Sequence, residues 1–245
     1  MPPPQSDARV EVHESAADLA TAVAGELLSR IADLQAAGDV PQIGLTGGTI
    51  ADAIHHEIAR LADDSGVDWG AVVFWWGDER YVAPDSPDRN ALQARQAFLD
   101  SLGVSAHNIH EFPATDTGLA VDEAARSFEA VVREFGSGSF DILMLGVGPD
   151  GHVASLFPGY PQLDVEDQIA VGVTDSPKPP PERLTFTFEA LNRSRSVWFV
   201  ASGESKAGAV AAALGGADRH ETPAAGVAGS EETIWFLDRE SASAL

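Results

Sequence analysis

The chain has 245 residues, enough for one large α/β domain or two small ones, and 44% of them are hydrophobic, as in an ordinary globular protein. The absence of cysteine excludes disulfides and a thiol nucleophile, and a net charge of −23 argues against nucleic acid or an anionic membrane as a partner. We recognise no secretory signal and no membrane-spanning apolar run, so we expect a cytoplasmic protein.

Predicted helices recur along the chain after residues 1–8, which we expect to be loosely ordered. The segment 15–37 carries apolar residues three and four apart, with Ser15 as a candidate N-cap and Gly38 as a stop, and predicts the first helix. The later helices are predicted near residues 50–63, 88–101, 118–135 and 204–214.

The predicted strands are short apolar segments that alternate with these helices. They cover residues 43–45, 71–76, 142–145, 169–173, 184–188, 196–201 and 233–237. Several are continuous apolar runs, which is typical of a parallel sheet covered by helices on both faces. The sequence therefore predicts a single Rossmann-like α/β domain over residues 1–245, with a mostly parallel sheet and a small β excursion near 165–190.

Three predicted strands end in a glycine-containing turn, LTGG at 45–48, WWGDER at 75–80 and LGVGPDGH at 145–152. Ligands of open parallel sheets bind beyond the carboxyl ends of the strands. We therefore expect these three turns to meet at one edge of the sheet and to form the active site of an enzyme.

The first two turns have candidate anion-binding groups. Gly47 and Gly48 stand where a helix begins, and backbone N–H groups there favour a phosphate, although an ordinary tight turn has the same pattern. The turn lacks the lysine of a P-loop, so we do not expect a nucleoside triphosphate. Arg80 in the second turn can bind a substrate anion or a developing oxyanion, or can form a structural ion pair.

The third turn matches the dinucleotide fingerprint G-x-G-x-x-G at Gly146, Gly148 and Gly151, but in a poor context. The helical piece expected over residues 152–157 is cut short by Pro158, and the negative charge of Asp150 would face a pyrophosphate. We favour His152 as a general base, oriented by Asp150, over a histidine that caps or packs a short helix.

Several segments resemble the 6-phosphogluconolactonase family in the order in which that family has them. They are GPDGHVASLFPG (148–159), WWGDERYVAPDSPDRNA (75–91), KPPPERLTFTFEALNRSR (178–195), GESKAGAV (203–210) and PAAGV (223–227). The resemblance spans roughly residues 43–240, and the run DGHxASLFPG is its most specific part. It implies a Rossmann-like fold and hydrolysis of 6-phosphoglucono-1,5-lactone to 6-phosphogluconate in the oxidative pentose phosphate pathway, without a cofactor.

The resemblance also implies roles for individual residues. His152 would activate water, with Asp150 beside it, and Arg80 would bind substrate or stabilise the oxyanion. The remaining substrate and phosphate contacts implied are Gly47, Gly48, Thr49, Asp78, Gly151, Lys178, Arg183 and Lys206. The chain has only two lysines, and both lie in matching segments, which suits an anionic substrate entering an acidic protein. We expect no metal ion, because Asp150 and His152 alone are a weak metal signal.

The first turn departs from the family pattern of serine, two glycines, serine, threonine and proline. Here it reads Thr-Gly-Gly-Thr-Ile over 46–50, either one residue shorter or with isoleucine in a polar position. This departure would remove one hydroxyl contact to the phosphate.

Two other functions remain open. One is that of an amino-sugar phosphate isomerase or deaminase, which also carries a DGH turn, although residues 153–157 lack the carboxylate that ring opening would use. The other is a sugar-phosphate sensor that binds without turnover. For the protein itself we expect a monomer or a weak homo-oligomer.

Overall fold

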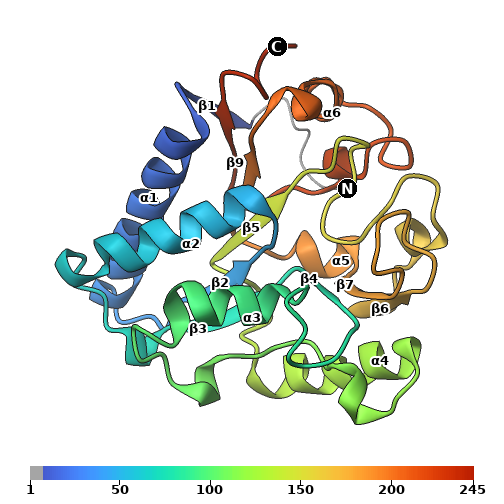
Figure 1. Cartoon of the computed structure of the whole chain (residues 1–245), viewed down its shortest axis with the longest axis horizontal. Helices are drawn as coiled ribbons and strands as arrows, with labels where there is room; N and C mark the ends of the chain where they lie inside the picture. Colours follow the sequence, from blue (N-terminus) through green and yellow to red (C-terminus); the bar gives the residue numbers. More distant parts are fainter. Residues whose placement is uncertain (1–7) are drawn as a thin grey trace.

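The computed structural model describes residues 8–245, and within them six parallel strands form the central sheet in the order β1-β9-β8-β5-β2-β3 (Figure 1). The expected loose end over 1–8 therefore lies outside the described residues, apart from Ala8. The strands of this sheet are β1 (Arg9–His13), β2 (Gln42–Leu45), β3 (Val73–Trp76), β5 (Ile142–Gly146), β8 (Ser196–Ala201) and β9 (Glu232–Asp238). Because every pairing is parallel, the six carboxyl ends lie at the same edge.

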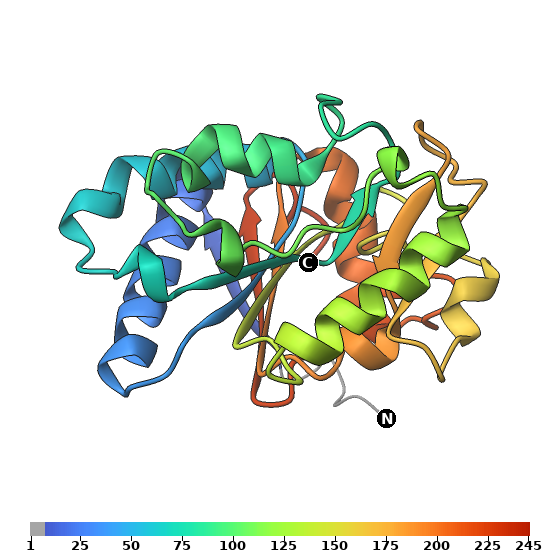
Figure 2. The same cartoon turned by 90° about the horizontal axis from the view of Figure 1, so that it is seen from below.

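The helices cover both faces of this sheet. They are α1 (Ala16–Ala36), α2 (Thr49–Leu61), α3 (Asn90–Ala94), α4 (Val121–Phe135), α5 (Phe188–Leu191) and α6 (Ala207–Leu214). The connections through α1 and α2 cross the sheet in one direction, and those through α4, α5 and α6 cross it in the other. Right-handed crossovers therefore place the two groups on opposite faces, as Figure 2 shows for α1 in blue and α4 in lime. This confirms the predicted α/β class.

The chain's apolar pattern explains the packing. All four residues of β2, all four of β3 and all six of β8 are buried, as expected of strands sandwiched between helices. Helix α1 begins where predicted, because the Ser15 hydroxyl accepts a hydrogen bond from the N–H of Asp18 at 3.2 Å. Gly38, with φ of 91°, follows its end.

A second, antiparallel sheet lies against α4. It contains the predicted β excursion near 165–190 and, in addition, a strand from residues 78–80. Its order is β4 (Asp78–Arg80), β7 (Arg183–Phe186) and β6 (Ala170–Val173). The prediction of a turn over residues 77–80 is therefore wrong for its last three residues, which form strand β4. Strand β4 continues almost directly from β3, so this connection joins the two sheets beside the carboxyl edge.

Two other local expectations fail. Residues 152–157 are not helical: Val153 and Leu156 hydrogen-bond to each other through their backbones, and Ala154 has φ of 49°. This tight turn lets both apolar side chains reach the core while Ser155 bonds to Asp78. Strand β1 was not predicted at all, because it is an edge strand whose valines are largely exposed and leave no buried apolar signal.

Candidate active site

A cavity of about 240 Å³ lies at the carboxyl edge of the central sheet, where it meets the second sheet. Segments that follow β2, β3, β5 and β8 contribute to its wall, together with the loop before β7. The lining residues are Thr46, Gly47, Gly48, Asp78, Arg80, Asn90, Gly146, Val147, Gly148, His152, Ala154, Phe157, Lys178, Pro179, Arg183 and Lys206. The three predicted turns therefore meet, and a fourth turn after β8 adds Lys206.

The turn after β5 holds a histidine and a carboxylate in contact. The Nδ1 atom of His152 lies 2.5 Å from Oδ1 of Asp150. Backbone hydrogen bonds within residues 148–152 close the turn, and a Cβ at Gly148 would lie 1.9 Å from the imidazole. Gly151 has φ of +81°, a conformation that favours glycine. Both glycines are thus needed to place the imidazole at the cavity.

The charge of Asp150 determines which tautomer His152 adopts. Burial is the largest single influence and raises the pKa of Asp150, but the hydrogen bond and charge of His152, with the charge of Lys178, lower it to about 2. An ionised carboxylate only accepts, so the proton in the contact belongs to Nδ1. The Nε2 atom of a neutral His152 is therefore a free base.

Two ammonium groups and a guanidinium lie on another part of the wall. Lys178 is 4.0 Å from Asp150, and burial together with the charge of Lys178 lowers the pKa of Lys206. Arg183 is 5% exposed and donates to the backbone carbonyls of residues 178–180, at 2.8 to 3.2 Å. These contacts hold Lys178 in place, while burial lowers the pKa of Arg183 itself.

Helix α2 points its amino end at the same cavity. Gly48 is its N-cap with φ of 103°, and no side chain caps the first turn. The first backbone N–H groups of this 13-residue helix are therefore directed toward the cavity, where they could bind an anion. Thr49 is exposed and does not line the cavity, so of the three expected phosphate contacts in this turn only Gly47 and Gly48 reach it, with Thr46 beside them.

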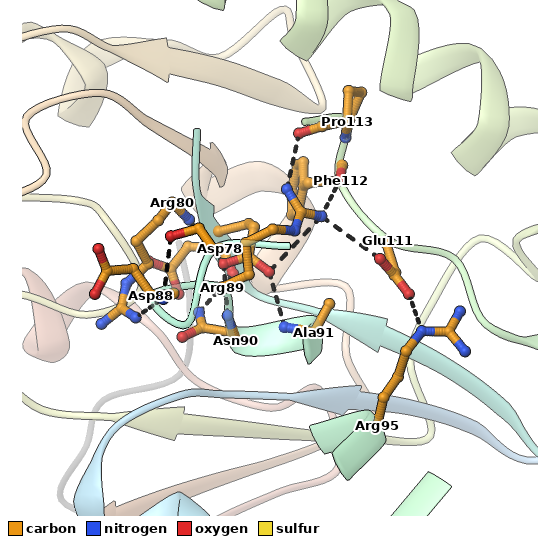
Figure 3. A network of polar contacts seen from close by, with 12 residues as sticks. Asp78, Arg80, Asp88, Arg89, Asn90, Ala91, Arg95, Glu111, Phe112 and Pro113 are labelled. Atoms are coloured by element: carbon orange, nitrogen blue, oxygen red, sulfur yellow. Dashed lines mark hydrogen bonds and ion pairs between the residues drawn. The ribbon is translucent and has the colours of Figure 1, made fainter. Parts of the chain in front are cut away.

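A buried polar network behind the cavity positions Arg80 and Asn90 (Figure 3). The carboxyl of Glu79 accepts hydrogen bonds from the backbone N–H groups of Arg80, Asn90 and Ala91, at 2.8 to 2.9 Å. Burial raises the pKa of Glu79 to about 7, although Arg89 and those N–H groups lower it. Glu79 thus joins β4 to the first turn of α3.

The guanidinium of Arg80 is held from one side. Its Nη1 donates to the carbonyl of Asp88 at 2.5 Å, while Nε is buried with no hydrogen-bond partner among the described residues. In Figure 3 Arg80 and Asn90 lie at the end of the network away from Glu111 and Arg95. Arg80 lines the cavity, so the unpaired N–H of Nε is a donor close to the cavity wall.

Asp78 is buried, and its carboxylate is hydrogen-bonded within the protein. Its Oδ2 accepts a 2.6 Å hydrogen bond from the hydroxyl of Ser155, which joins β4 to the turn that follows His152. Asp78 therefore links two parts of the cavity wall in addition to lining it.

The cavity brings together most of the predicted site residues but not all of them. Thr49, Asp150 and Gly151 do not line it; Asp150 lies behind His152, and Gly151 packs on Thr222. Sequence reasoning missed Asn90, whose only signal was its place near the start of a predicted helix and inside the matching segment 75–91.

The structure offers a larger cavity, of about 410 Å³, at the opposite edge of the sheet. Gln42 at the start of β2 and Phe140 just before β5 are among its lining residues, and none of the predicted site residues is. The smaller cavity is the candidate active site because it holds a base, several cations and a helix amino end.

Residues 8–245 contain no group of three or more potential ligands arranged for a metal ion. Across the same residues, no helix is long and apolar enough to cross a membrane.

Comparisons with known proteins agree with one another. The family model of glucosamine-6-phosphate isomerases/6-phosphogluconolactonase matches residues 14–235. The 6-phosphogluconolactonase of Streptomyces coelicolor is 41% identical over 96% of this chain and 93% of that protein. The 6-phosphogluconolactonase of Mycobacterium tuberculosis is also 41% identical, over 93% of this chain and 95% of that protein. The crystal structure of 6-phosphogluconolactonase from Thermotoga maritima superposes with a TM-score of 0.82 at 26% identity, covering 94% of this chain and 99% of that one.

Proposed function

This chain belongs to the family of glucosamine-6-phosphate isomerases and 6-phosphogluconolactonases, and we propose on that basis that it hydrolyses 6-phosphoglucono-1,5-lactone to 6-phosphogluconate in the pentose phosphate pathway. The observation that carries the proposal is the 2.5 Å contact between His152 and Asp150 on a cavity that also has several cations. Such a site can activate water beside an anionic, already reactive ester. Three relatives at 41% identity are named 6-phosphogluconolactonases, which favours this branch over the isomerase or deaminase.

The reaction begins at Nε2 of His152. This atom takes a proton from water as the water oxygen attacks the lactone carbonyl carbon, and Asp150 stabilises the imidazolium that forms. The tetrahedral intermediate then collapses and breaks the bond between the carbonyl carbon and the ring oxygen. The imidazolium returns its proton to that departing oxygen, which becomes the C5 hydroxyl. The product is a carboxylic acid that ionises at neutral pH.

The negative charge of the intermediate falls on the former carbonyl oxygen. Arg80 supports this state in our proposal, because its buried Nε has an N–H to donate and its Nη1 is fixed on Asp88. A donor that is already oriented needs little rearrangement when the charge develops.

The phosphate in this proposal lies between Lys206, Lys178 and the amino end of α2. Burial, and then the charge of Lys178, lower the pKa of Lys206, and a phosphate dianion between the two ammonium groups would favour the charged form of Lys206. Gly47 and Gly48 let it approach the helix backbone. Arg183 acts mainly through Lys178, whose carbonyl it binds.

The test is a lactone assay with substrate made freshly from glucose 6-phosphate by its dehydrogenase, followed as proton release in a pH-stat. We expect hydrolysis far above the spontaneous rate, and a fall of about 10²- to 10⁴-fold in kcat for His152→Ala. His56→Ala, at an exposed histidine on α2, serves as the matched control. An unchanged rate in His152→Ala would refute the base assignment. A cytoplasmic location and a monomeric or weakly associated state stay predictions from the sequence.

A further inference from the structure

Asn90 is the first residue of α3 and lines the cavity, although only 2% of its surface is exposed. Its backbone N–H donates to Glu79 at 2.8 Å, and its side-chain Nδ2 donates to the carbonyl of Asp78 at 3.0 Å. These two bonds fix the position of the side chain and the orientation of its amide. The Oδ1 atom must then be the oxygen that faces away from Asp78.

That oxygen is buried and has no hydrogen-bond partner among the described residues. It packs against Gly47, where an added Cβ would lie 1.8 Å from Oδ1. Gly47 and Asn90 both line the cavity, at the point where the turn after β2 meets α3 (Figure 3 shows the amide). Buried acceptors without a partner are uncommon in folded proteins, and in a binding cavity a ligand can supply the missing donor.

The chemistry of the missing partner is restricted. An amide oxygen needs a donor, and neither a phosphate dianion nor a lactone carbonyl has one to give. The hydroxyl groups on the sugar ring do. Arg80, Lys178 and Lys206 are donors and suit the anionic parts of the substrate. The carboxylate of Asp78 also lines the cavity, but its Oδ2 already accepts a hydrogen bond from Ser155.

We propose that Oδ1 of Asn90 accepts a hydrogen bond from one ring hydroxyl of the sugar lactone, so that Asn90 selects substrates carrying that hydroxyl. This proposal rests on the proposed function and adds a specificity determinant to it. A site built to bind a hydroxyl discriminates against the analogue lacking it, because the buried acceptor is then left unpaired.

The experiment compares wild-type protein and Asn90→Ala on four lactones, the parent 6-phosphogluconolactone and its 2-deoxy, 3-deoxy and 4-deoxy analogues, by proton release. In wild type we expect one analogue to lose about 10- to 100-fold in kcat/KM. In Asn90→Ala we expect that same analogue and the parent to agree within about threefold, because the partner of the hydroxyl is gone. Asn108→Ala, at a half-buried asparagine outside the cavity, should keep the wild-type pattern.

Two results would overturn the proposal. One is an equal fractional loss on all four lactones in Asn90→Ala, which indicates a purely structural role. The other is a wild-type protein that hydrolyses the parent and all three analogues equally well, a result that needs no variant to fold. If wild type hydrolyses no lactone at all, the proposed function fails, and this proposal with it.

Discussion

Replacing Glu79 by glutamine should change how the stability of the protein depends on pH. The side chain is 1% exposed, and burial raises its pKa from an ordinary 4.5 to about 7, even with Arg89 at 4.0 Å and three backbone N–H groups on the carboxylate. The folded protein therefore binds a proton at this site more tightly than the unfolded chain does. Glu79→Gln has a neutral side chain of the same shape at all pH values.

The sign and size follow from linkage between protonation and folding. Below pH 4.5 both states carry the proton, and the contribution to the free energy of unfolding is constant. Between pH 4.5 and 7 the unfolded chain loses its proton first, so the wild type loses stability relative to Glu79→Gln as the pH rises. One pKa unit corresponds to about 1.36 kcal/mol, so the full change from 4.5 to about 7 amounts to about 3 kcal/mol.

Urea unfolding at half-unit steps from pH 4.5 to 8 measures this quantity. We expect the difference in unfolding free energy, wild type minus Glu79→Gln, to fall by up to about 3 kcal/mol and to level off above pH 7. Glu240→Gln, at an exposed carboxylate, should give a nearly flat difference. Parallel curves for wild type and Glu79→Gln would refute the reasoning and would mean that Glu79 ionises equally easily in both states. A difference that rises with pH would mean that its N–H donors outweigh its burial.

Three further substitutions test the site. Asp150→Asn should lower kcat by about 10²-fold or more while leaving the fold intact, because the amide no longer stabilises the imidazolium of His152; wild-type turnover in the pH-stat would contradict this. Gly151→Ala should lower the free energy of unfolding in urea by about 1–3 kcal/mol, since φ is +81° and a Cβ would lie 2.9 Å from a buried threonine methyl; Gly208→Ala, with open space around it, should not. Lys206→Ala should weaken 6-phosphogluconate binding about 10- to 100-fold in calorimetry, and unaltered affinity would remove this lysine from the phosphate site.

Much of the fold follows from local patterns in the sequence. The continuous apolar runs indicate strands buried on both faces, and helical spacing between them indicates parallel connections, which together predict the central sheet. Parallel pairing then places every strand's carboxyl end at one edge, so the convergence of the turns after β2, β3 and β5 was predictable as well. The contact of His152 with Asp150 is also local, because the two residues share one tight turn.

Other features depend on contacts between distant parts of the chain. Asn90 becomes a cavity residue only because Glu79 and Asp78 hold it against Gly47, and Ser155 bonds to Asp78 across 77 positions of sequence. The segment 152–157 was wrongly predicted to be helical, also because of contacts with distant residues. Burial of its apolar side chains in the core outweighs the helical tendency of the local sequence.

The sequence by itself thus determined the α/β class, the edge of the sheet that holds the candidate active site, and the histidine–aspartate pair. All of these depend on residues close together or on the repeat of strand and helix. Only the tertiary structure decided which donors and acceptors remain unpaired at the cavity, among them Nε of Arg80 and Oδ1 of Asn90. The physical reason is that hydrogen-bond satisfaction and burial are properties of the packed chain. They arise when the second sheet and α3 dock beside the central sheet, and no local spacing of residues encodes them.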